Sequence, residues 1–169
     1  TDYDYLHGIA SGENGFYSVG SFYGSTSIGN NTFTSMGSQD IFLSSYEDDG
    51  NCLWSKQIGS PKTDYVNAID VDPEGNVIVT GHYYDSIAIA DTMIYTGSGS
   101  DIFMAKYNPM GEMLWVKNFG GSSSDQSYSL SCDDDGNILF TGSFFYDIQL
   151  GDTLLTTQHP TGVFFAKLN

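Results

Sequence analysis

The chain has 169 residues, of which 40% are hydrophobic and 15% aromatic, and its 21 Asp and Glu face only five Lys and no Arg. This length and composition argue for one folded domain with its own core and against a disordered segment. A net charge of −16 repels phosphate backbones and anionic lipid, which argues against nucleic acid and membrane insertion; cations, neutral glycans and basic protein surfaces remain open as partners.

No apolar run approaches the length of a membrane span, and Thr1 begins directly in foldable sequence, as in a mature or trimmed product. The excess of acidic residues is typical of a soluble, exported protein. Two cysteines, Cys52 and Cys132, are too few for a disulfide framework. They are expected on different strand types of different units, so we expect no bridge between them.

The sequence repeats at an offset of 61 residues, as from Gly20 to Gly81 and from Gly81 to Gly142. Further residues coincide at this offset: Phe42, Phe103 and Phe164, Trp54 and Trp115, Lys56 and Lys117, Asp64 and Asp125, and Asn76 and Asn137. Unit one is one residue shorter near its start. Agreement at one fixed offset indicates copies of one structural unit, assigned to residues 1–63, 64–124 and 125–169.

In chain order, every predicted element is a strand. Unit one contains a small hairpin at 26–35. Unit two shows the full pattern, which in chain order consists of strands at 65–72 and 77–84, a small hairpin at 86–96, and strands at 101–107 and 113–120. The tip of this hairpin is either Ala90–Asp91 or Asp91–Thr92. Unit three repeats the hairpin at 147–157 and has nothing equivalent to 112–120. β-branched and aromatic residues fill these runs, whereas Gly, Asn, Asp and Pro separate them.

Four main antiparallel strands and a small hairpin in about 60 residues predict a β-propeller blade. The main alternative, a β-solenoid, has much shorter coils. We name the strands A to D from the axis outward; Trp54 and Trp115 then lie on strand D, where a large ring covers the space between blades.

The chain holds about 2.8 units, whereas propellers usually close with roughly four to eight blades. The sequence therefore predicts an all-β, incomplete ring whose third blade lacks its outermost strand. The missing blades belong either to a longer polypeptide, which we favour, or to further copies of this chain, as in a dimer of three blades.

The pattern W-x-K…G…D…D-x-x-G-N…T-G…D-I-F-x-A-K resembles the SBBP-type β-propeller repeats of secreted bacterial proteins. It is most similar to the versions in Bacteroidota, which are often exported by the type nine secretion route. The residues that carry the resemblance are Trp54–Lys56, Gly59, Asp64, Gly75–Asn76, Thr80–Gly81, Asp101–Phe103 and Ala105–Lys106. The resemblance implies an extracellular or cell-surface protein and implies no reaction. Gly162–Val163 departs from it, because the Asp of D-I-F is lost in unit three.

Asp64 and Asp125 occupy equivalent loops before strand A, with Asp4 in the corresponding place of unit one. Carboxylates on the inner rim could bind a hard cation such as calcium through oxygen ligands. The alternative is that each Asp caps a turn by bonding its own backbone. The same alternatives apply to Asp40 and Asp101, before strand C. No cofactor is otherwise expected.

Aromatic residues recur at the end of strand B, where Tyr23, Tyr84 and Phe145 are equivalent. Beside Asp85 in unit two and Asp147 in unit three, such rings suit the apolar faces of sugars and define a candidate glycan site. The alternative is structural: one ring of each aromatic pair packs between blades, and the other leans on the small hairpin.

No catalytic set is evident in the sequence. His7, His82 and His159 are not equivalent and are expected at the surface or in loops. Nucleophile-elbow, phosphate-loop and dinucleotide motifs are absent from the sequence. The run at 70–81, DVDPEGNVIVTG, begins like the calcium loop of an EF-hand. That loop ends on a bidentate Glu, but this run has Gly81 there, so we interpret it as a hairpin turn.

The sequence thus predicts a non-catalytic, extracellular scaffold, adhesion or binding module whose first partners are other blades of its ring. A glycan-binding propeller is the alternative within the binding class. From a different class, a propeller hydrolase or lyase would have its active site on the face with the longer loops, because the regular A–B and C–D turns make a poor ligand site.

Overall fold

A computed structural model describes residues 3–169 of the chain. Their strands are β1 (Asp4–Gly12), β2 (Gly15–Phe22), β3 (Ser25–Ile28), β4 (Asn31–Thr34), β5 (Asp40–Glu47), β6 (Cys52–Gly59), β7 (Tyr65–Val71), β8 (Val77–Ile89), β9 (Thr92–Tyr107), β10 (Met113–Phe119), β11 (Asp125–Cys132), β12 (Ile138–Leu150) and β13 (Thr153–Leu168). Within the described residues there is no helix with the length and hydropathy of a membrane span.

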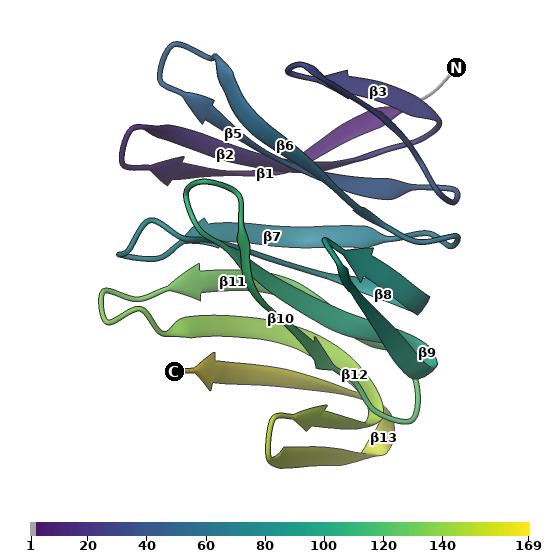
Figure 1. The fold of residues 1–169 in the computed structure, drawn as a ribbon. Coiled ribbons are helices and arrows are strands. Elements are labelled where there is room, and N and C mark those ends of the chain that lie inside the picture. Colours follow the sequence, from purple (N-terminus) through teal and green to yellow (C-terminus); the bar gives the residue numbers. More distant parts are fainter. Residues whose placement is uncertain (1–2) are drawn as a thin grey trace.

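The strands form three antiparallel blades that lie face to face in chain order (Figure 1). Blade one contains β1, β2, β5 and β6 with the separate hairpin β3–β4, blade two contains β7 to β10, and blade three contains β11 to β13. The innermost strand β7 lies between β1 and β11. Residues 3–169 do not close a ring, so the prediction of an all-β, incomplete propeller is confirmed.

The small hairpin differs from the prediction in one respect. In blades two and three it is continuous with strands B and C, so that β8 and β9 run without a break from the blade into the hairpin. The bend falls at Asp85 and at the equivalent Tyr146, which have φ of 69° and 66°. Ile89 pairs with Thr92, and this places the hairpin tip at Ala90–Asp91, one of the two predicted positions.

Each hairpin also joins its blade to the one before it. Ile89 and Ala88 of β8 pair with Ile58 and Gly59 of β6, the outer strand of blade one. At the next junction, the N–H of Gln149 donates to the carbonyl of Gly120 over 2.9 Å. The hairpin therefore supplies backbone hydrogen bonds to the edge of strand D, which a blade would otherwise leave unpaired.

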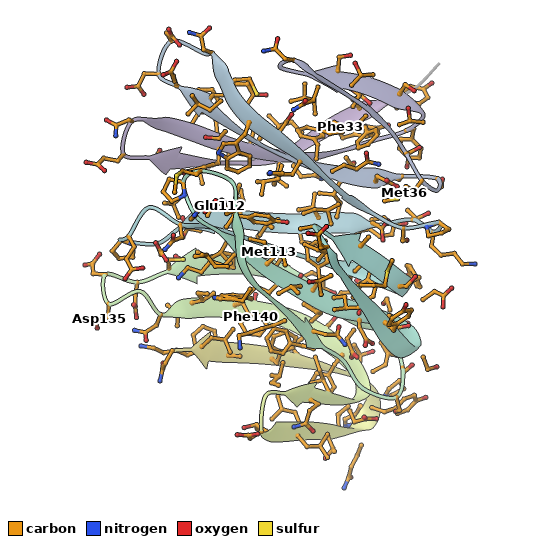
Figure 2. The ribbon with its side chains drawn as sticks, viewed as in Figure 1. Phe33, Met36, Glu112, Met113, Asp135 and Phe140 are labelled. Carbon is orange, nitrogen blue, oxygen red and sulfur yellow. The ribbon has the colours of Figure 1, made fainter. Side chains whose placement is uncertain are left out.

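The core consists of two apolar layers, one at each blade junction. Between blades one and two the buried side chains include Val19, Ile41, Leu43, Ile58, Val79, Tyr83, Phe103 and Tyr107. Between blades two and three they include Ile78, Ile102, Met104, Phe119, Ile138, Phe140, Phe144 and Phe164. Phe140, labelled in Figure 2, lies against the rings of Phe119 and Phe164, with centroids 5.2 and 5.3 Å apart. The core thus lies between blades rather than within any one of them.

The tryptophans of strand D cover the junctions, as predicted. Trp54 packs against the first apolar layer, and its Nε1–H donates to the carbonyl of Pro109 in the C–D turn of blade two over 2.9 Å. Trp115 packs against the second layer. The two cysteines are unpaired and belong to different blades, as expected.

Candidate functional site

The acidic residues of the A–B turns cap those turns. Asp72 Oδ1 accepts the N–H groups of Glu74 and Asn76, each over 2.9 Å, and Asp72 Oδ2 lies 2.6 Å from Lys106 Nζ. Burial alone would raise the pKa of Asp72, but the hydrogen bonds from Lys106 and Asn76 hold it below its usual value. Asp133 repeats the arrangement with Asn137 and Lys167. These carboxylates are fully engaged, which confirms the interpretation of 70–81 as a hairpin turn.

One ring of each aromatic pair at the end of strand B packs between blades, which agrees with the first part of the structural alternative. Phe22, Tyr83 and Phe144 are buried between blades. Their neighbours Tyr23 and Tyr84 are half-buried, and Phe145 is exposed. Asp85 is exposed at the bend that leads into the hairpin.

Two of the predicted ring positions belong to a larger aromatic cluster. Tyr65 stacks on His82 with centroids 4.6 Å apart, and Tyr84 lies edge-on to both rings. Burial raises the pKa of Tyr65, and the charges of Tyr84 and Tyr23 raise it further. We call Tyr23, Tyr65, His82 and Tyr84 the aromatic cluster; its three tyrosine rings are partly open to solvent and could contact the apolar face of a sugar.

Sequence reasoning missed two members of this cluster. Tyr65 opens strand A and pairs with His82 across the A–B hairpin, in a register that a bulge between Val66 and Ala68 sets. His82 was expected at the surface, and this is wrong: it is buried on β8, bonds Asn67 Oδ1 through Nδ1 over 3.0 Å, and is covered by Tyr65. Burial lowers the pKa of His82 to about 4, so the ring is neutral at physiological pH.

The aspartates before strands A and C meet in pairs, one pair at each blade junction. Asp64 of blade two lies beside Asp40 of blade one, and its N–H donates to the neighbouring carbonyl of Gln39 over 3.0 Å. Burial raises the pKa of Asp64 to about 7, and the charge of Asp40 contributes in the same direction. Burial likewise raises the pKa of Asp125 to about 7, with contributions from the charges of Asp101 and Asp147.

Asp64 and Asp125 thus belong to two separate junctions, each with its own partner from strand C. Within residues 3–169, no three or more His, Cys, Asp or Glu side chains form a ready-made metal cluster. Any cation bound here would be held by two carboxylates and neutral oxygens.

A cleft of about 230 Å³ opens on the face that carries the A–B and C–D turns. Its lining includes Tyr17, Leu53, Glu74 and Pro109, from turns and strands of blades one and two. Figure 2 labels Glu112 and Asp135, which lie in turns of this face. The sequence favoured the opposite face for ligands, because it did not show that turns of neighbouring blades stand apart around Tyr17.

Comparison with known proteins agrees with this fold. Residues 53–82 match the family SBBP, described as a beta-propeller repeat. The chain is 31% identical over 153 residues to an uncharacterized WD repeat-containing protein of Acanthamoeba polyphaga mimivirus, a match that covers 83% of this chain and 11% of that protein. Both matches agree with the stacked, propeller-type blades of the fold, and the chain spans about a tenth of that relative's length.

A crystal structure of a protein of unknown function from Bacteroides caccae is also similar, with a TM-score of 0.36 and 13% identity. The match covers 98% of this chain and 61% of the other.

Proposed function

We propose that this chain is a non-catalytic part of a larger extracellular propeller, a scaffold or adhesion module of a bacterial surface protein completed by further blades of the same repeat. The observation that carries the proposal is the contrast between equivalent residues on covered and uncovered blade faces. Ile41 and Ile102 are 0% exposed, whereas the equivalent Val163 of blade three is 82% exposed. Two residues further along the same strands, Leu43 and Met104 are 0% exposed, whereas the equivalent Phe165 of blade three is 69% exposed.

The uncovered face of blade one, at the other end of the stack, also exposes apolar side chains. Blade one exposes Leu6 and Ile9 and has a hollow of about 420 Å³, lined also by Phe16, Ile28 and Phe42. In blade two, the residues equivalent to Phe16, Ile28 and Phe42 are Val77, Ile89 and Phe103. All three are buried against blade one. Apolar faces of this size are typical of surfaces that another protein layer covers, and the repeat itself specifies the complementary layer.

A scaffold role, as opposed to catalysis, is supported by the equivalence of the polar residues. The aspartate pairs and turn caps recur from blade to blade, whereas an enzyme needs a unique polar cluster in one place. The strongly acidic composition and the resemblance to secreted SBBP-type repeats support an extracellular location.

The test is the mass of the chain in solution, measured by light scattering during gel filtration. We expect species larger than the 18.4 kDa monomer, formed as blade faces cover one another. Phe165→Lys should shift the distribution toward the monomer, while Met110→Lys, on an exposed turn, should leave it unchanged. A folded monomer of 18.4 kDa at all concentrations would contradict the proposal.

The aromatic cluster favours glycan binding as a second candidate function. The rings of Tyr65 and Tyr84 lie edge to face, Tyr23 of the neighbouring blade contributes to the raised pKa of Tyr65, and Asp85 lies at the bend. A glycan array probed with the assembled protein should then give signals that Tyr84→Ala removes and Tyr95→Ala, an exposed ring of the hairpin, retains. An array without signals would exclude this candidate and leave the scaffold role standing.

A further inference from the structure

Each blade junction buries two carboxylates that have no cationic partner. Asp40, Asp64 and Asp125 are 0% exposed, and Asp101 is 3% exposed. The ion pairs found within residues 3–169 join other groups, Lys106 to Asp72 and Lys167 to Asp133. A buried carboxylate without compensation costs several kcal/mol, so each pair needs a proton or a cation.

In each of these carboxylates one oxygen accepts hydrogen bonds and the other has no hydrogen-bond partner. In the first junction, Asp40 Oδ2 accepts from Met36 N (3.0 Å; Met36 is labelled in Figure 2) and Gln57 Nε2 (2.6 Å), and Asp64 Oδ1 accepts from Ser60 Oγ (3.1 Å). Asp40 Oδ1 and Asp64 Oδ2 are buried without any hydrogen-bond partner.

The second junction repeats this arrangement with equivalent residues. Asn118 Nδ2 donates to Asp101 Oδ2 over 3.2 Å, and Gly121 N donates to Asp125 Oδ2 over 2.8 Å. Asp101 Oδ1 and Asp125 Oδ1 are the orphaned atoms. Buried polar atoms without partners are rare in proteins, and a pattern that occurs twice at equivalent positions calls for a common cause.

The two carboxylates of a junction are held by the same dipeptide at the end of strand D. A Cβ on Gly59 would lie 2.3 Å from Asp40 Cγ, and the next residue, Ser60, bonds Asp64. A Cβ on Gly120 would lie 2.2 Å from Asp101 Cγ, and the next residue, Gly121, bonds Asp125. The glycine lets strand C's carboxylate approach the backbone, and the residue after the glycine bonds the other carboxylate, so both acids lie at the end of the same strand D.

The chemistry of this point favours a hard cation. The unpartnered atoms at each junction are carboxylate oxygens, and oxygen ligands bind calcium and magnesium in preference to softer metals. Burial opposes ionisation of these acids, but the N–H and O–H donors on the hydrogen-bonded oxygens favour the ionised carboxylate, the form that binds a cation. We propose that each blade junction binds one hard divalent cation, with Ca²⁺ as the best candidate, between the orphaned oxygens of Asp40 and Asp64 and of Asp101 and Asp125.

The two sites differ in one respect. Asp147 accepts the N–H of Ser122 over 3.1 Å beside the second junction and lies near enough for its charge to act on Asp125. Ser86 occupies the equivalent position at the first junction. The additional negative charge should make the second site the tighter of the two.

The test uses the whole chain, freed of metal by a chelator and titrated with CaCl₂ and, separately, MgCl₂. We expect about two bound Ca²⁺ per chain by calorimetry or native mass spectrometry, and a rise in Tm of roughly 5–10 °C at saturating Ca²⁺. Asp40→Asn and Asp101→Asn should each remove one bound ion, whereas Asp91→Asn, at an exposed hairpin tip, should retain both.

Terbium luminescence on the wild-type chain gives a second measurement if an Asn variant does not fold: Ca²⁺ should displace bound Tb³⁺. The proposal is overturned if the wild-type chain shows no bound Ca²⁺ or Mg²⁺ and no shift in Tm. Binding that survives unchanged in the Asp40→Asn, Asp101→Asn double variant would equally overturn it. A double variant more stable than the wild type and indifferent to metal would assign the pairs to a shared proton instead.

Discussion

At the residue scale, the glycine that recurs in strand B is required by an irregularity in strand A. The register between β7 and β8 shifts between Val66 and Ala68, and this bulge brings the carbonyl of Tyr65 against Gly81. A Cβ at Gly81 would lie 1.8 Å from that oxygen. Gly20 and Gly142 face the carbonyls of Tyr5 and Gln126 in the same way. The repeated glycine thus marks a close backbone approach.

We expect Gly81→Ala to lower the free energy of unfolding by about 2–4 kcal/mol, because backbone must move to admit the methyl group. Gly97→Ala is the matched control: its Cβ would lie 3.8 Å from the nearest atom, so its effect should stay within about 0.5 kcal/mol. Urea unfolding followed by circular dichroism measures both. Equal effects of the two substitutions would contradict this account of the glycine.

His82 gives the protein a pH dependence with a defined sign. Burial lowers its folded-state pKa to about 4, while the unfolded chain binds a proton near pH 6.5. Between these values only the unfolded state is protonated at this residue, so stability falls as the pH falls through this range, by up to about 1.4 kcal/mol per pH unit.

The His82→Gln variant isolates this contribution from the titration of the carboxylates. Relative to the variant, the wild-type protein should lose stability between pH 7 and pH 5 in urea unfolding. Parallel pH profiles of the two proteins would show that His82 is not held neutral by the fold.

At the element scale, the A–B hairpin is tied to strand C by an ion pair that is present in two blades and absent from the first. Lys106 on β9 reaches Asp72, and Lys167 on β13 reaches Asp133. In blade one Ser45 stands where these lysines stand. The two pairs differ in burial, with side chains 16% and 2% exposed in the first and 46% and 29% exposed in the second.

This difference makes the two pairs an internal comparison. Lys106→Met leaves the buried Asp72 carboxylate without its counter-charge and should cost about 3 kcal/mol. Lys167→Met leaves Asp133 in contact with solvent, which screens its charge, so this substitution should cost much less. Denaturant unfolding of both variants measures the costs, and a larger cost for Lys167→Met would contradict the assignment of burial as the cause.

At the scale of the whole molecule, blade two is the blade whose two faces are both covered within residues 3–169. Its β8 contributes Val79 to one apolar layer and Ile78 to the other. Blade one and blade three each leave one face open, as Ile9 and Phe165 show. In such stacked repeats, stability depends on the interfaces between neighbours, and the blade with two interfaces should be the most stable.

Native-state hydrogen exchange tests this distribution of stability. We expect the slowest exchange in β8 and β9 and faster exchange in β1 and β13, measured by mass spectrometry on peptides from the folded chain. If further blades cover the open faces on self-association, protection of β1 and β13 should rise with protein concentration. Uniform protection across the three blades at low concentration would contradict the ranking.

The period of the sequence was sufficient to predict the blades, their turns and the places of the tryptophans, because these depend on local strand and turn chemistry that repeats with the unit. Gly75–Asn76 and Trp54 occupy the structural positions that their spacing indicated. The same period could not show which equivalent residues become neighbours. It aligned Asp64 with Asp125, but the fold pairs each of them with an aspartate of the preceding blade.

Sequence alone therefore determined the fold class, the incomplete ring and the candidate residues of this protein. Only the tertiary structure decided that the hairpin of one blade completes the edge of another, that His82 is buried under Tyr65, and that four carboxylate oxygens have no hydrogen-bond partner among residues 3–169. The physical reason is that a repeat records what each unit shares, whereas burial, pairing and unmet hydrogen bonds arise where two different units meet.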